Sequence, residues 1–446
     1  MESSDPAPES LASIRSEWHP FIGGAARTVK LWVAAAFTGV LGAIATEGFR
    51  MMIDAVEWLT TGRIGRLVPL AESLEPWHRA AVVAIGGLAA GLVLDRGMRW
   101  ASKGPAGANH TDYIEAAREG NVALNDRTTF VRSISALLSV GTGAAVGKEG
   151  AMVQLSSWFA SIFARIMPLR GDERNAILVC GIAAGIGSAY HAPVAGVVFV
   201  LELALGFFAR HTVAPVLISA ATSSALIYWL VEPEPLYVMP SVPLVSTSLG
   251  VAIAAGVICG GLGWAFLELL ERCRRLFARI GPFPWRLGLG GLIVGLISAA
   301  VPDVWGNGYS VVSRVLQGRL AWDWVALIMV AKIAATVVSS GSGAIGGVFT
   351  PTLFVGATSG FVMAHFASVW VDPSIVGDPR VLAVIGMAAV LAAVTHAPLM
   401  AIVMVLEMTN QFQLTVPVML ACGVAYAIST QFGARPLYGN PIEAHR

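Results

Sequence analysis

The chain has 446 residues, of which 56% are hydrophobic and only 13% are charged. Soluble domains carry about 25% charged residues, and a single soluble core stops growing at roughly 250–300 residues, so this composition excludes an ordinary soluble protein. The net charge of +1 gives no reason to expect a nucleic-acid partner.

Apolar segments recur along the whole chain, and each is about as long as needed to cross a hydrocarbon layer of about 30 Å, or longer. In chain order they fall at 31–46, 79–94, 151–166, 176–205, 213–232, 247–270, 285–301, 322–338, 348–371, 381–408 and 413–431. The sequence therefore predicts an all-α polytopic membrane protein. We expect an N-terminal segment at 1–30 without a cleavable signal, a membrane domain at 31–436, and a short tail at 437–446 with no C-terminal regulatory domain.

Basic residues form three clusters next to the apolar segments. They are Arg15, Arg27 and Lys30; Arg96, Arg99 and Lys103; and Arg272, Arg274, Arg275, Arg279 and Arg286. By the positive-inside rule the clusters face the cytoplasm, which predicts a multi-pass protein of the cell (inner) membrane with both ends inside. The four cysteines (Cys180, Cys259, Cys273, Cys422) follow no motif spacing, so neither a metal nor a cofactor is expected.

Two blocks of sequence occur twice. Residues 139–151 (SVGTGAAVGKEGA) and 339–351 (SSGSGAIGGVFTP) share a serine, three glycines and an alanine at an offset of 200. Residues 180–203 and 385–408 share His-Ala-Pro and a following Leu-Glu at an offset of 205. Because order and spacing are nearly kept, the sequence predicts two structural repeats at roughly 79–232 and 285–436.

The second block also predicts broken helices. Each of its apolar runs is about 30 residues long and contains a proline, Pro193 or Pro398, which removes a backbone donor and disfavours helix in the preceding residue. We expect two helices in each run, meeting at His-Ala-Pro, with His191 and His396 in a structural role. In transporters, binding sites lie between such repeats, at helices that stop partway across the membrane.

The first block predicts an anion site. Its glycine-rich turns at 141–150 and 341–347 each lead into an apolar helix, and a helix N-terminus offers unpaired N–H groups with a partial positive charge. Two such turns facing one point, without a buried lysine, would bind an anion weakly enough to release it. The competing interpretation is close helix packing, as in Gly143/Gly147 or Gly181/Gly185.

Glu149 stands in the first turn of the helix after the first of these turns. A carboxylate at membrane depth costs roughly 2.5–3.5 kcal/mol and usually marks an ion pathway. Being an anion, it could occupy the site of a free anion and leave when protonated, which makes a gate. It could equally be a helix-capping glutamate, and from the residues alone both interpretations stay open.

The other motifs give weaker indications of function. Thr142 and Glu149 break the phosphate-loop pattern, and nothing local pairs Ser342 with His396 as an intramembrane hydrolase requires, so no enzyme is expected. Glu202 and Glu407 match between the repeats, and we expect them to pair with buried backbone donors. Tyr438 after the last segment is typical of an interfacial anchor.

The chain resembles the CLC family of chloride channels and proton/chloride antiporters, most of all its bacterial ClcB-type branch. The resemblance spans about residues 30–440 and rests on GKEG at 147–150, GGVFTP at 346–351, VLEMT at 405–409 and PLY at 436–438, with TDYIEA at 111–116 and WGNGYS at 305–310 typical of the branch. It implies an inverted-repeat fold and a homodimer with one gated chloride pathway in each subunit.

Residue roles follow from the same resemblance. It implies that Glu149 is the gate and that the amides of Val348 and Phe349 and the hydroxyl of Tyr438 contact the central ion. The backbone around Gly147, Lys148 and Gly150 would line the outer end of the pathway, and chloride would be the transported ion.

Two positions depart from the family pattern. Asn109 falls where the ion-binding serine is expected, and Leu203 falls where antiporters carry an internal proton-transfer glutamate. Leucine cannot carry a proton, so passive voltage-gated conduction is favoured. The alternatives are a proton-coupled antiporter, with Glu202 as its proton acceptor, and a fluoride exporter, against which the retained Phe349 and Tyr438 argue.

Overall fold

The computed structural model describes residues 11–103, 112–120, 123–204, 212–230, 235–240 and 249–438, with side chains from residue 27 onward. These ranges contain eighteen α-helices. In the first half they are α1 Leu11–Thr61, α2 Leu67–Glu72, α3 Pro76–Ala101, α4 Tyr113–Arg118, α5 Asp126–Gly141, α6 Glu149–Ile166, α7 Gly171–Tyr190, α8 Pro193–Phe199 and α9 Val213–Leu230. In the second half they are α10 Leu249–Phe277, α11 Phe283–Ala300, α12 Tyr309–Leu316, α13 Trp322–Ser342, α14 Phe349–Trp370, α15 Pro373–Val376, α16 Pro379–Thr395, α17 Pro398–Thr409 and α18 Thr415–Gln431.

The helices confirm the predicted all-α membrane class. Eight helices of the described ranges are long and apolar enough to cross a membrane. The apolar runs at 176–205 and 381–408 are different, because they form the interior. All residues of α16 from Val381 to Thr395 are buried, and a helix that is apolar all round belongs inside a larger assembly.

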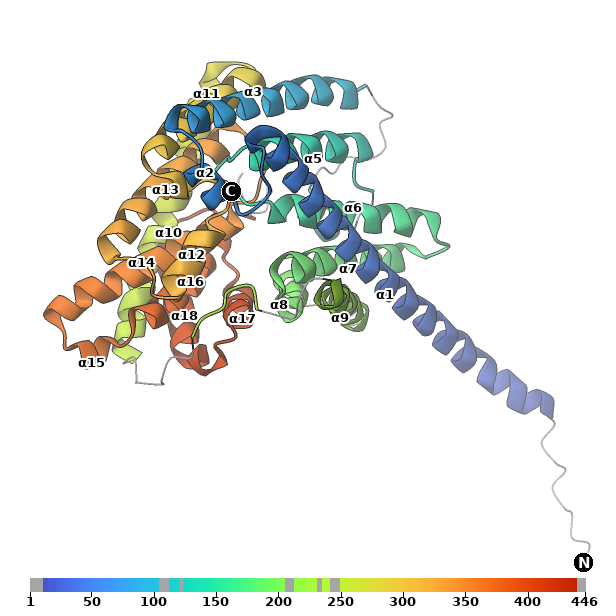
Figure 1. Cartoon of the computed structure of the whole chain (residues 1–446). Helices are drawn as coiled ribbons and strands as arrows, with labels where there is room; N and C mark the ends of the chain where they lie inside the picture. The colour runs from blue at the N-terminus through green and yellow to red at the C-terminus, as the bar shows by residue number, and fades with distance from the viewer. Residues whose placement is uncertain are drawn as a thin grey trace, which may run out of the picture.

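The two halves of the chain have the same internal packing and lie side by side (Figure 1). In the first half α7 packs against α6, α9 and α1; in the second half α16 packs in the same way against α14, α18 and α10. This equivalence reaches α1 and α10, which precede the repeats predicted at 79–232 and 285–436.

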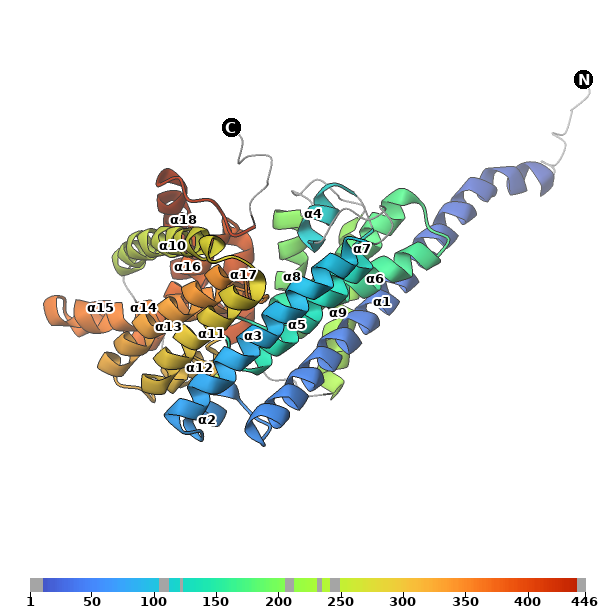
Figure 2. The same ribbon diagram turned by 90° about the horizontal axis from the view of Figure 1, so that it is seen from above.

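The halves are inverted relative to each other. The equivalent helices α3 and α11 pack together along their length (Figures 1 and 2). A Cβ added at Gly87 would lie 2.4 Å from the carbonyl oxygen of Leu287, and one at Gly291 would lie 2.4 Å from that of Val83. Residue numbers thus rise along α3 as they fall along α11. Equivalent helices that cross antiparallel require an inverted pair, so the predicted inverted-repeat fold is confirmed.

Both long apolar runs are broken at His-Ala-Pro, as the sequence predicts. The histidines end α7 and α16 in the left-handed conformation, with φ 54° at His191 and 55° at His396. Pro193 and Pro398 then begin α8 and α17, where a missing N–H costs no helical hydrogen bond. Each imidazole also packs edge-on against a tyrosine of the last helix of its half, so both histidines have the expected structural role.

The short helices α8 and α17 are joined crosswise by carboxylates. Glu202, in the π-helical turn Val200–Ala204 after α8, accepts hydrogen bonds from the N–H groups of Leu399 (3.2 Å) and Met400 (2.7 Å) at the start of α17. Glu407 of α17 does the same for α8, where it accepts from Val194 (3.1 Å) and Ala195 (2.9 Å). The predicted pairing with backbone donors is confirmed, and each carboxylate serves the opposite half.

Candidate anion pathway

The two glycine-rich turns meet at the centre of the molecule. Gly147 and Gly347 form an antiparallel bridge in which each N–H donates to the other's carbonyl oxygen over 2.7 Å. Side chains would not fit there, since a Cβ on Gly147 would lie 2.3 Å from a Glu149 carboxylate oxygen and one on Gly346 would lie 2.4 Å from Val146. Gly147 and Gly346 thus allow the two turns to touch.

A small cavity lies where α6 and α14 begin, two residues beyond this bridge. It encloses about 20 Å³, room for the centre of about one water-sized particle. Its walls are Tyr113, Glu149, Gly150, Val153, Ile186, Tyr190, Phe199, Gly347, Phe349, Met404 and Tyr438. Helix starts leave N–H groups without intrahelical partners, so two partial positive charges border one enclosed space.

The cavity brings together four of the residues singled out in the sequence, namely Glu149, Gly150, Phe349 and Tyr438. Gly147 forms the bridge behind it, and Lys148 and Val348 are the N-cap residues of α6 and α14; these three are not part of the cavity wall. Asn109 lies outside the described residues. Tyr113, which lies in the TDYIEA motif, and Tyr190 are also part of the wall, and the sequence motifs assign neither a role in the site.

The Glu149 side chain is only 5% exposed. One carboxylate oxygen accepts a hydrogen bond from the amide nitrogen of Asn307 at 2.5 Å, while the other is buried without a protein partner among the described residues. Neither oxygen accepts a backbone N–H in the first turn of α6. The carboxylate therefore lies at the cavity wall and does not cap its own helix.

Asn307, which contacts Glu149, is a further residue to which the sequence motifs assign no role. Its side-chain oxygen accepts the N–H of Tyr309 at the start of α12 (3.0 Å), which orients its amide nitrogen toward Glu149. The preceding loop is held by Lys332, whose ammonium group donates to the carbonyl oxygens of Val304 (2.6 Å) and Gly306 (2.5 Å). A polar residue between two glycines, as in Gly-Asn-Gly, was the available signal.

The position of Lys332 qualifies the expectation of a site without a buried lysine. No lysine is part of the cavity wall, but Lys332 of α13 is fully buried behind the loop that carries Asn307. Its ammonium group donates to two backbone carbonyls of that loop and does not reach the cavity wall.

Tyr438 reaches the cavity because the chain after α18 folds back into the protein. The N–H of Leu437 donates to the carbonyl oxygen of Val394 (2.9 Å), and Arg118 donates to that of Tyr438 (3.0 Å). The phenol packs edge-on against Phe199 at 5.7 Å. An interfacial anchor would point to the membrane surface, which this residue does not.

Three further expectations from the sequence can be compared with the structure. Ser342 donates to the carbonyl oxygen of Ser339 (2.8 Å), and His396 contacts Ser429 (3.3 Å), so the two are not paired as a nucleophile and base. Leu203 is buried, and its backbone carbonyl oxygen accepts a hydrogen bond from Arg118.

Gly181 packs against Ala160 and Gly185 against Ser156, which confirms close packing for that glycine pair.

Comparison with known proteins gives the same family along most of the chain. The profile of the family described as "Voltage gated chloride channel" matches residues 86–430. A ClcB-like chloride channel protein of Ralstonia nicotianae is 42% identical, covering 92% of this chain and 96% of that protein. The voltage-gated ClC-type chloride channel ClcB of Escherichia coli is 38% identical, covering 92% and 98%.

Solved structures share the fold. A slow cyanobacterial Cl⁻/H⁺ antiporter has a TM-score of 0.78 at 24% identity, covering 92% of this chain and 96% of that one. A CLC-type fluoride/proton antiporter has a TM-score of 0.71 at 23% identity, covering 91% and 96%. The family profile, the two channel relatives and the inverted halves agree, and the chain belongs to the voltage-gated chloride channel, or CLC, family.

Proposed function

We propose that the chain forms a chloride-conducting pathway in each subunit of a homodimer in the inner membrane, gated by Glu149. The observation that carries this proposal is the buried carboxylate of Glu149 at a cavity between two inverted helix starts. The membrane position is supported by the eight apolar helices, and the ion by the names of the two channel relatives.

In the proposed mechanism the Glu149 carboxylate and a chloride ion compete for the cavity between the starts of α6 and α14. The starts of α6 and α14 stabilise one negative charge in the cavity without a full cation in its wall. When Glu149 is ionised, its own negative charge lies beside these helix starts and blocks the path. When it is protonated, or displaced by an entering chloride, the cavity accepts the free anion. Apart from the protonation of Glu149, no covalent bond is made or broken, so neither catalytic residues nor a cofactor are needed.

Passive conduction is favoured over proton-coupled exchange. Leu203 carries no titratable group, and both carboxylate oxygens of Glu202 are already engaged by α17. Glu407 makes the equivalent contacts with α8, which supports a shared structural duty for the pair. The cavity retains Phe349 and Tyr438, which supports chloride over fluoride as the transported ion.

Reversal potentials of the purified protein in planar bilayers test this proposal. Under opposed chloride and pH gradients the potential should follow the Nernst value for chloride, and a chloride gradient should drive no uphill proton movement into proteoliposomes. Proton pumping would contradict the channel mechanism. If Glu202→Gln then abolished pumping while Glu407→Gln, its matched control, did not, Glu202 would be the proton acceptor.

The hydrogen bond from Asn307 should stabilise the closed gate. Asn307→Ser removes the amide that reaches Glu149 but keeps an oxygen able to accept from the N–H of Tyr309. Hydrogen bonds to charged groups contribute about 1.5–3 kcal/mol, so the gate equilibrium should shift toward open by roughly tenfold or more. Chloride efflux from proteoliposomes measures the shift as a faster rate.

Asn307→Ala separates this role from a structural one. It lacks both the amide and the oxygen that accepts from Tyr309, so an equal rise in both variants supports the contact with the gate. A rise in the alanine variant alone would place the effect in the start of α12.

A further inference from the structure

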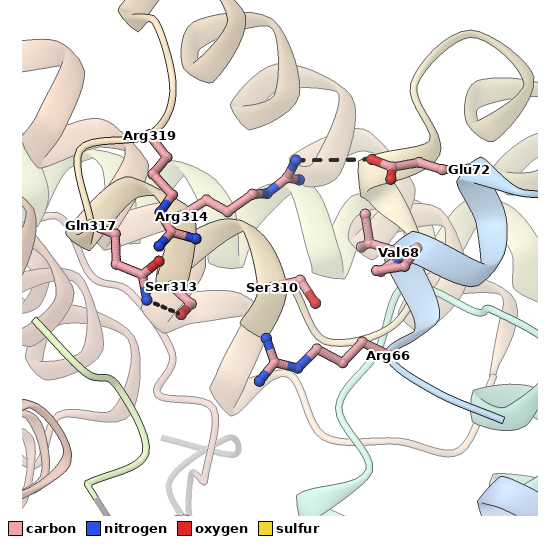
Figure 3. Close-up of a pocket in the computed structure, with 9 residues that line it drawn as sticks. Arg66, Val68, Glu72, Ser310, Ser313, Arg314, Gln317 and Arg319 are labelled. Atoms are coloured by element: carbon pink, nitrogen blue, oxygen red, sulfur yellow. Dashed lines mark hydrogen bonds and ion pairs between the residues drawn. The ribbon is translucent and has the colours of Figure 1, made fainter.

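A second cavity, separate from the pathway, lies between α2 and α12 (Figure 3). Its volume is about 330 Å³, far more than a single chloride needs. The helix α2, which forms one side of the cavity, directly precedes the start of α3, where Ala80 contacts Gly295 of α11. Farther along α3, Gly91 contacts Phe283 at the start of α11, next to the basic loop that follows α10. The cavity is thus on the face opposite that basic loop, which the positive-inside rule makes the outer face.

The wall of this cavity carries an excess of positive charge. It is formed by Arg66, Val68, Pro69, Glu72, Ser310, Ser313, Arg314, Gln317 and Arg319. Three arginines stand against one glutamate, and Asp303, which pairs with Arg314 from behind, leaves an excess of one positive charge. Two serine hydroxyls and the amide of Gln317 add neutral donors on the α12 side.

The arginines are only partly satisfied by the protein. Arg314 pairs with Asp303 and lies 3.9 Å from Glu72, and its Nε is buried without a hydrogen-bond partner. Arg66 is exposed and stacks over the ring of Tyr309 at 5.5 Å. Within the described part of the chain neither Arg66 nor Arg319 has a carboxylate partner. Guanidinium groups with free donors match planar or tetrahedral oxyanions, which they bind in a bidentate manner.

We propose that this cavity is an oxyanion site for a phosphate group, held by Arg66, Arg314 and Arg319. The group is either free phosphate or the headgroup of a phospholipid in the outer leaflet. Chloride itself fits poorly, because it is a small sphere that cannot span guanidinium groups on different walls of a 330 Å³ cavity.

The cavity is connected to the gate by a short path. Ser310 belongs to the first turn of α12, and Tyr309, over which Arg66 stacks, begins that helix. The N–H of Tyr309 is bound by Asn307, whose amide contacts Glu149. A phosphate group that draws Arg66 away from Tyr309 therefore acts on the residue that orients Asn307, and its occupancy changes the chloride flux.

Binding is measured directly, by ³¹P NMR line broadening of inorganic phosphate added to the purified protein in detergent. The double variant Arg66→Gln/Arg319→Gln should bind phosphate at least roughly tenfold more weakly, since it loses two charge-assisted contacts. Arg63→Gln, which removes an exposed charge three residues before Arg66, is the matched control and should bind as the wild type does.

A lipid arm distinguishes the two sources of phosphate. Thermal stability is compared in dodecyl maltoside, a detergent without phosphate, with and without added phosphatidylglycerol. Free-phosphate binding that depends on Arg66 and Arg319 supports a soluble ligand, and stabilisation by phosphatidylglycerol with the same dependence supports a headgroup. Equal responses of the wild type and the double variant in both arms would overturn the site, whatever the outcome for chloride conduction.

The link to the gate has its own readout. The ratio of chloride efflux with and without phosphate, or with and without phosphatidylglycerol, should differ from one in the wild type and return to one in the double variant. Phosphate that competed inside the pathway would change the ratio equally in both proteins and would overturn the coupling.

Discussion

Glu149→Gln is expected to raise chloride flux and to flatten its dependence on pH. The glutamine amide has nearly the shape of a protonated carboxyl group but cannot become an anion, so it does not compete with chloride for the helix starts of α6 and α14. It also loses the charge-assisted part of the Asn307 contact. At about 1.4 kcal/mol per tenfold change, losing even one such contact of about 1.5–3 kcal/mol opens the gate by roughly tenfold or more.

Chloride efflux from proteoliposomes at several pH values measures this effect. Glu271→Gln is the control, because Glu271 pairs with Arg274 in the exposed basic end of α10, far from the cavity in the sequence and absent from its wall. Wild-type flux with a wild-type pH response in Glu149→Gln would remove Glu149 from the gate.

Of the substitutions considered, Lys332→Met is expected to lower the free energy of unfolding the most. Methionine keeps the apolar stem but leaves the buried carbonyl oxygens of Val304 and Gly306 without their donor. Two hydrogen bonds to a charged group, at about 1.5–3 kcal/mol each, are lost. The free energy of unfolding should therefore fall by about 3–6 kcal/mol. The unfolding midpoint in detergent measures the loss.

The flux of Lys332→Met adds a second measurement. The loop released by this substitution carries Asn307, so any protein that folds should show a faster chloride flux. Lys103→Met, at an exposed position after α3, is the control and should change neither quantity. An unchanged unfolding midpoint in Lys332→Met would mean that the loop does not depend on this ammonium group.

Local rules explain what the sequence predicts well. Pro193 and Pro398 act on their own neighbours, so both helix breaks could be placed to within a few residues. The glycine-rich turns were recognisable because they occur twice, and duplication distinguishes a shared backbone shape from a chance glycine pair. The start of α6 at Glu149 follows from the same turn.

Contacts across the fold were not predictable from one sequence. Asn307 is 158 residues from Glu149, and no periodicity or motif connects them. The pairing of Glu202 with backbone donors was predicted, but only the inverted packing of α8 against α17 shows that those donors belong to the other half. Interior helices also carry a weak signal, because α16 is as apolar as a membrane span and differs only in what surrounds it.

The crosswise carboxylates have a consequence for biosynthesis. Glu202 enters the membrane 197 residues ahead of Leu399, and the start of α8 at Val194 precedes Glu407 by 213 residues. At about 5–20 residues per second, translation leaves Glu202 and the start of α8 without their hydrogen-bond partners for roughly 10–40 s. A carboxylate without its donors at membrane depth costs roughly 2.5–3.5 kcal/mol. The half made first therefore stays incomplete until α17 inserts. If translation stops before residue 398, neither Glu202 nor Glu407 can form its hydrogen bonds with the other half.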